Sequence, residues 1–204
     1  MESTTHEKLK SIKQSFRLLM SGPTSQSMRS KGFGYKINWG VQLPQLREMA
    51  VEYGKDYDLA AALWKEDIRE CKILATMIMP ADQMLPELAD VWMEQTPTQE
   101  IAELCAMNLY QHLDYAPVLA FEWIASDQPL RQLCGYHILA RLFRGGQVPN
   151  ERGINEFLDQ VHVVLQAGGI GVRHAAMNSL NCFCELGPAY EQIAKSAMRD
   201  LDIL

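Results

Sequence analysis

The chain reads Trp39-Gly40-Val41-Gln42-Leu43-Pro44-Gln45-Leu46-Arg47 at the start of the region that decides its fold, residues 35–75. Pro44 suits the first turn of a helix, because a proline there loses no hydrogen bond, and Gly40 relaxes the turn before it. Further amphipathic segments follow, carrying Leu63-Trp64 and Ile68-Arg69-Glu70-Cys71. The region therefore predicts a loop, a helix, a short break and another helix.

The same helical pattern continues along the whole chain. Apolar residues recur with a 3.6-residue period and alternating β-branched runs are absent, which predicts an all-α fold. Turn signals such as Ser21-Gly22-Pro23, Thr96-Pro97 and Gly187-Pro188 separate the segments, and short connections favour antiparallel helix hairpins. The expected helices cover residues 6–20, 44–54, 57–64, 67–79, 84–94, 98–111, 115–126, 129–143, 151–166, 171–186 and 188–201.

A weak internal repeat narrows the architecture. Arg69, Arg131 and Arg173 each lie near the start of an apolar helix, as in HEAT repeats, where such arginines bridge neighbouring layers. We therefore expect a HEAT-like repeat α-solenoid with a concave face. It would form a single domain over residues 1–204, with residues 1–25 as an N-terminal helix and linker.

Composition bounds the class of protein. A chain of 204 residues, with 48% hydrophobic and 22% charged residues, suits one soluble globular domain. It has neither an apolar run of membrane-spanning length nor the layout of a signal peptide at its N-terminus, so we expect a cytoplasmic protein without a membrane partner. The five scattered cysteines indicate buried thiols, and Cys182-Phe183-Cys184 directs its sulfurs about 200° apart on a helix. We expect no metal and no cofactor.

The net charge of −6 restricts nucleic-acid binding to a local basic patch, because phosphate contacts by Lys and Arg supply most sequence-independent affinity. Basic residues concentrate around residues 29–36 and 141–173, while acids crowd residues 82–103. We expect Arg173 to be the best candidate for a phosphate contact. The other expected DNA-binding residues are Lys36, Arg141 and Arg144.

The motifs quoted above resemble those of the DNA alkylation repair family, the AlkD-like glycosylases. That family has a Gly-Val/Ile-x-x-Pro-x-x-Arg segment followed by Leu-Trp and an Arg-Glu helix. Trp123-Ile124-Ala125-Ser126-Asp127 is similar to the family's Trp-Ile-x-Ser-Asp helix end. The resemblance covers about residues 28–190.

This resemblance implies a DNA glycosylase that excises N3- or N7-alkylated purines from duplex DNA. Tyr110 and Asp114 match the family's aromatic residue and Asp, at a spacing that places both on one helix face. Asp114 would stabilise the positive charge that develops on the sugar and orient water, while Tyr110 would pack on the sugar. Two other family positions, an Arg and a second Trp, carry Leu133 and Asn178 here.

Two other interpretations stay open. Asp114 also suits the N-cap of a helix that starts near Tyr115. Separately, the net acidity, Leu133 and Asn178 favour a non-catalytic member of the family, which uses its concave face to bind unusual DNA structures or another protein.

Overall fold

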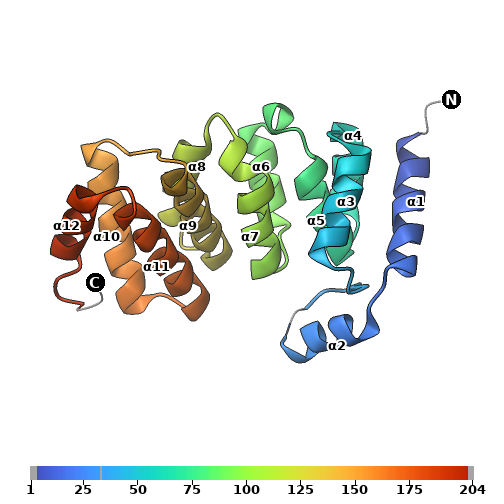
Figure 1. Ribbon diagram of the computed structural model, residues 1–204, viewed down its shortest axis with the longest axis horizontal. Coiled ribbons are helices and arrows are strands. Elements are labelled where there is room, and N and C mark those ends of the chain that lie inside the picture. Colours follow the sequence, from blue (N-terminus) through green and yellow to red (C-terminus); the bar gives the residue numbers. More distant parts are fainter. Residues whose placement is uncertain (1–3, 33, 202–204) are drawn as a thin grey trace. The chain divides into compact units, whose positions relative to one another are not determined.

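The computed structural model of the protein describes residues 4–32 and 34–201. Within these residues the fold is all-α, as predicted, and no strand forms; Ile37 and Ile68 make only an isolated parallel bridge (Figure 1). None of the described helices is long and apolar enough to span a membrane. The helices are α1 (Thr5–Leu18), α2 (Gly22–Ser30), α3 (Leu43–Tyr53), α4 (Tyr57–Lys65), α5 (Arg69–Ile78), α6 (Pro86–Glu94), α7 (Gln99–Asn108), α8 (Ala116–Ile124), α9 (Pro129–Arg144), α10 (Glu151–Ala167), α11 (Ile170–Cys184) and α12 (Pro188–Ala197), with 3-10 helices η1 (Ala81–Gln83) and η2 (Tyr110–His112).

The helices pack as two compact units, Met1–Leu109 and Tyr110–Leu204. Each unit has its own buried apolar residues and is described by itself. That the chain forms a single domain stays a prediction.

Helix α5 is the centre of the first unit. It packs on α3, α4 and α7, and nine of its ten residues are buried. Helix α1 packs on α4 through Ile12 and Phe16, both fully buried. Trp64 of α4 stacks on Trp92 of α6 with ring centroids 4.1 Å apart, so large aromatic residues join successive helix pairs.

Helix α9 has the same central place in the second unit. It packs on α8 and α11, and α10 packs on α11 in turn. Phe143, Phe157 and Phe183 form an aromatic cluster with centroid separations of 5.1 to 5.5 Å. The cluster ties α9, α10 and α11 into one core.

Three elements differ from the sequence prediction, and one of them is α12, which ends at Ala197 and not at residue 201. The sequence predicted no helix between residues 20 and 44 and assigned the residues up to 25 to a linker. Helix α2 nevertheless forms there, with nine residues capped by Ser21, whose hydroxyl accepts from the Thr24 N–H. The predicted helix over 98–111 is also wrong at its end, because α7 stops at Asn108. Leu109 leaves the helical region with φ −132° and ψ −62°, and the short helix η2 follows.

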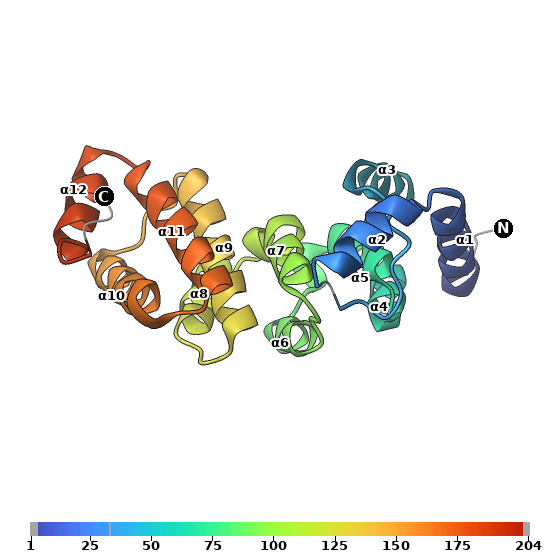
Figure 2. The same ribbon diagram turned by 90° about the horizontal axis from the view of Figure 1, so that it is seen from below.

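The Trp39 loop, residues 35–42, passes against α2 at Gly40. This glycine has φ +71°, and a Cβ there would lie 2.4 Å from the Ser21 carbonyl oxygen. Helix α2 lies crosswise beneath the end of α5 (Figures 1 and 2). Close backbone approach at Gly40 therefore fixes the α2 segment against the loop.

Gly40→Ala should lower the free energy of unfolding by about 2–3 kcal/mol, because overlap with the Ser21 backbone adds to the strain of a left-handed conformation. Gly146→Ala is the matched control, since Gly146 has φ +79° but nothing within 4 Å of its added Cβ. It should cost only about 1 kcal/mol. Urea denaturation measures both, and equal costs would contradict the close approach.

All five cysteines are free thiols, and four of them are buried. Burial, together with the nearby Glu66 carboxylate, raises the pKa of the Cys71 thiol to about 12. These thiols pack as small apolar residues, as the sequence predicted.

Candidate nucleic-acid interface

A buried ionic network anchors the Trp39 loop to the start of α5. Glu70, which is fully buried, accepts the backbone N–H groups of Trp39 and Val41, each at 3.2 Å. Arg69 donates to the Val41 carbonyl oxygen at 3.2 Å and to Glu70 at 3.3 Å. The Arg-Glu pair noted in the sequence therefore holds a loop in place and is not available to a ligand.

The same network reaches α7 through Glu100. Arg69 Nε and Nη2 donate to the two oxygens of Glu100 at 2.9 and 2.6 Å, a bidentate pair. Tyr35 donates to Glu100 and lies 2.7 Å from the Thr98 hydroxyl. Burial by itself would lower the pKa of Arg69, but Glu100 and Glu70 raise it above its ordinary value. Arg69 is thus a permanently charged structural residue.

Cationic side chains line one face of α1. Lys10, Lys13 and Arg17 follow one another at helical spacings of three and four residues, with His6 one turn earlier. Together with Leu9, Gln14 and Glu66 they line a groove of about 440 Å³ beside the end of α4. We call this the α1 groove. The sequence analysis did not single it out, although the regular spacing of the basic residues was visible there.

The cations of the α1 groove differ in the contacts that they make with other side chains. Lys13 pairs with Glu66 at 2.9 Å, and the Arg17 guanidinium lies 5.8 Å from the ring centroid of Trp39. Lys10 is exposed and pairs with no carboxylate among the described residues, as is also true of Arg29 on α2. Uncompensated positive charge therefore remains at this surface.

The distribution of charge along the chain singles out this end. Residues 1–47 contain eight Lys and Arg against two Glu, a net charge of +6. Residues 48–204 carry the remaining 11 basic and 23 acidic residues, a net charge of −12. The basic patch that an acidic protein needs for polyanion binding is thus concentrated on α1, α2 and the Trp39 loop.

The structure places the predicted DNA-binding residues in different surroundings. Lys36, in the Trp39 loop, is exposed and lies 3.6 Å from Asp67. On the last turn of α9, Arg141 is half-buried and Arg144 is exposed. Burial raises the pKa of the Cys182 thiol, and the charge of Arg144 opposes that rise, which places Arg144 near α11.

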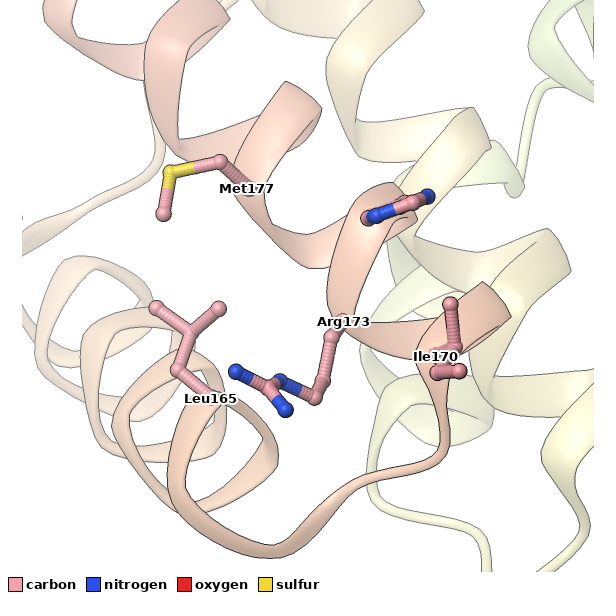
Figure 3. A pocket seen from close by; sticks show the side chains of 5 residues that line it. Leu165, Ile170, Arg173 and Met177 are labelled. Atoms are coloured by element: carbon pink, nitrogen blue, oxygen red, sulfur yellow. The ribbon is translucent and has the colours of Figure 1, made fainter.

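Arg173 borders a small pocket between α10 and α11. The pocket, about 250 Å³, is lined by Leu165, Ile170, Arg173, His174 and Met177. Figure 3 shows the Arg173 side chain reaching from α11 toward Leu165 on α10. Arg173 is exposed and forms no ion pair among the described residues, so its guanidinium is accessible to a phosphate.

If Arg173 contacts a phosphate, Arg173→Ala should reduce the salt dependence of DNA binding by about 0.9 units of log–log slope. Binding titrations at several salt concentrations measure this slope. Arg199→Ala, which removes another exposed cation of the same unit, is the control. An unchanged slope in the Arg173 variant would leave that residue with a structural role.

Tyr110 and Asp114 do not lie on one helix face, contrary to the prediction. Tyr110 belongs to η2 and is fully buried, with its ring edge-on to Trp123 at a centroid distance of 5.3 Å. Asp114 is exposed in the turn before α8. The reason is the helix break at Leu109, which removes the i, i+4 relation. A buried Tyr110 has no surface with which to pack on a sugar.

Asp114 is not a helix cap either. The N-cap of α8 is Tyr115, and no side chain caps that helix. Leu133 is buried on α9 and Asn178 is half-buried on α11, so neither position supplies a charge or an aromatic surface. Among the described residues, no group of three or more His, Cys, Asp or Glu side chains is arranged to hold a metal ion.

Comparison with known proteins identifies the type of chain. A sequence model of the family described as DNA alkylation repair enzyme matches residues 12–158. No curated protein matches the chain significantly. The chain is similar to a solved structure described as "A new family of proteins related to the HEAT-like repeat DNA glycosylases with affinity for branched DNA structures", with a TM-score of 0.84 and 18% sequence identity. The match covers 94% of this chain and 82% of that chain, which confirms the predicted HEAT-like repeat fold.

Proposed function

The chain belongs to the DNA alkylation repair enzyme family, and from this premise we propose that it is a DNA-binding protein that holds branched DNA without excising bases. The observation that carries the proposal is the α1 groove, which lies in a segment of net charge +6 within an acidic protein. The described affinity of the structural neighbour for branched DNA supports the choice of ligand.

The spacing of the cations suits a phosphate backbone. Lys10 and Arg17 are seven residues apart, which corresponds to about 10 Å along a helix axis. Phosphates of one DNA strand advance about 3.4 Å per nucleotide along the duplex axis, so α1 spans about three phosphates. Contacts of this kind fix the position of a protein on DNA without reading its sequence.

The second unit lacks the arrangement of side chains that base excision requires, which favours DNA binding without excision. Stabilising a cationic sugar requires a carboxylate and further groups arranged around one point. Here Asp114 is exposed on a turn, Tyr110 is fully buried, and the position of the family's Arg carries Leu133. The carboxylate has lost the neighbours that the family resemblance implied for it.

The proposal is tested by titrating the full chain with a labelled three-way junction and with a linear duplex of equal length. We expect salt-sensitive binding to both and tighter binding to the junction. Absence of binding to either DNA at 50 mM salt would overturn the proposal. Equal affinities would reduce it to general duplex binding.

Base excision at Asp114 is the second candidate, favoured by the exposure of that carboxylate to solvent. Its test is release of 7-methylguanine and 3-methyladenine from methylated duplex DNA. We expect no release by the unmodified protein. Release that disappears in Asp114→Asn, and persists in the control Asp127→Asn, would replace the binding proposal with glycosylase activity.

A further inference from the structure

The turn between α1 and α2 carries two exposed apolar side chains. Leu18, the last residue of α1, is 87% exposed, and Met20 is 60% exposed. Leu19 between them is half-buried. We call Leu18 and Met20 the apolar tip. Exposed apolar side chains that lie close together form a patch, and such patches mark sites of interaction.

The apolar tip is held by ordered backbone on both sides. The Leu19 N–H donates to the Ser15 carbonyl oxygen at 3.0 Å, which closes the last turn of α1. The Ser21 N–H donates to the Trp39 carbonyl oxygen at 2.9 Å, and Ser21 also caps α2. The two side chains therefore project from a fixed turn.

One cation directly precedes the apolar tip, and another lies on the helix that follows it. Arg17 precedes the tip, is exposed, and has its guanidinium carbon 5.8 Å from the ring centroid of Trp39. Arg29 lies on α2, where it donates at 3.1 Å to the hydroxyl of Ser25, which itself donates to the Asn38 carbonyl oxygen at 2.8 Å. Trp39 and Asn38 are neighbours in the Trp39 loop, so that loop connects both arginines to the tip.

This combination matches the chemistry of a DNA branch point. At a branch the outermost base pairs present flat apolar faces, bordered by phosphates. Proteins that distort DNA insert Leu, Met or similar side chains between base steps and hold the adjacent phosphates with Arg and Lys. A protein partner would need no flanking positive charge, whereas the net charge of +6 over residues 1–47 is complementary to DNA.

We propose that Leu18 and Met20 act as a wedge that stacks on the exposed base pairs at a DNA branch point, while Arg17 and Arg29 hold the bordering phosphates. This inference rests on the proposed function. It assigns recognition of the branch to the apolar tip and general affinity to the cations of the α1 groove.

The test compares the full chain with the double variant Leu18→Ser and Met20→Ser. The variant should bind the three-way junction about tenfold more weakly, because two apolar contacts are lost, while its affinity for linear duplex stays within about twofold. Val51→Ser on α3, which removes another side chain that is 84% exposed, is the control and should change neither affinity. Thermal unfolding verifies that each variant is folded.

A second readout reports the wedge directly. With 2-aminopurine in a base pair at the branch point, binding of the unmodified protein should raise the fluorescence, because Leu18 and Met20 replace a base of another arm as the stacking neighbour. The double variant should leave it low. An unchanged ratio of junction to duplex affinity would overturn the wedge while leaving the proposed function intact. Failure of the unmodified protein to bind any DNA would overturn both proposals.

Discussion

Changing Lys10, Lys13 and Arg17 together to glutamine should weaken DNA binding about 10²–10³-fold near 0.1 M salt, since each lost phosphate contact costs about tenfold there. The log–log slope against salt should become shallower by about 2.7 units, that is, about 0.9 for each contact. Glutamine preserves most of the side-chain length, and none of the three residues is buried. Binding titrations between 50 and 300 mM salt measure both quantities.

A charge-matched control separates local contact from net charge. Changing Arg152, Lys195 and Arg199 to glutamine removes the same number of exposed cations outside the α1 groove. That variant should lose little affinity and keep the slope. If the two triple variants weaken binding equally, the α1 groove is not the DNA contact.

Glu70→Ala should lower the free energy of unfolding by about 3–5 kcal/mol, the cost of breaking a buried ion pair from one side. It removes the acceptor of the Trp39 and Val41 N–H groups and leaves Arg69 with one carboxylate partner, Glu100. Chemical denaturation measures the loss. Hydrogen exchange should also quicken at the Trp39 and Val41 amides, because their bonds to Glu70 are gone.

Glu52→Ala serves as its control, because Glu52 lies exposed on α3 and should change stability by no more than about 0.5 kcal/mol. If Glu70→Ala is no more destabilising than Glu52→Ala, the network is not what holds the Trp39 loop. A third variant, Glu100→Gln, tests the other end. Its loss in the free energy of unfolding should lie between those of Glu52→Ala and Glu70→Ala, because Glu100 is only partly buried.

Most helices could be predicted from the sequence because their boundaries are local. Prolines mark the first turn of α3, α6, α8, α9 and α12, and apolar spacing indicates the buried faces. Helix α2 was missed although Pro23 marks its first turn in the same way. Its sequence, Gly-Pro-Thr-Ser-Gln-Ser-Met-Arg-Ser, has weak helix propensity, and contacts such as Ser25 to the Asn38 carbonyl hold it.

The candidate site was less predictable because it depends on a helix break and on contacts between residues that are far apart in the sequence. The apolar spacing from Cys105 to Leu113 runs on without a Gly or Pro, so the sequence did not mark the break at Leu109 that buries Tyr110. Arg69 and Glu100 are 31 residues apart, and only the fold brings them together. The α1 cations were visible as a pattern, but their shared groove beside Glu66 was not.

The protonated state of the buried Cys71 thiol affects how readily alkylating agents react with this protein. Alkylating agents react with thiolates far faster than with thiols, and a pKa of about 12 leaves only about one Cys71 side chain in 10⁵ ionised at pH 7. A methylating agent would therefore find almost no thiolate at Cys71, which is also fully buried.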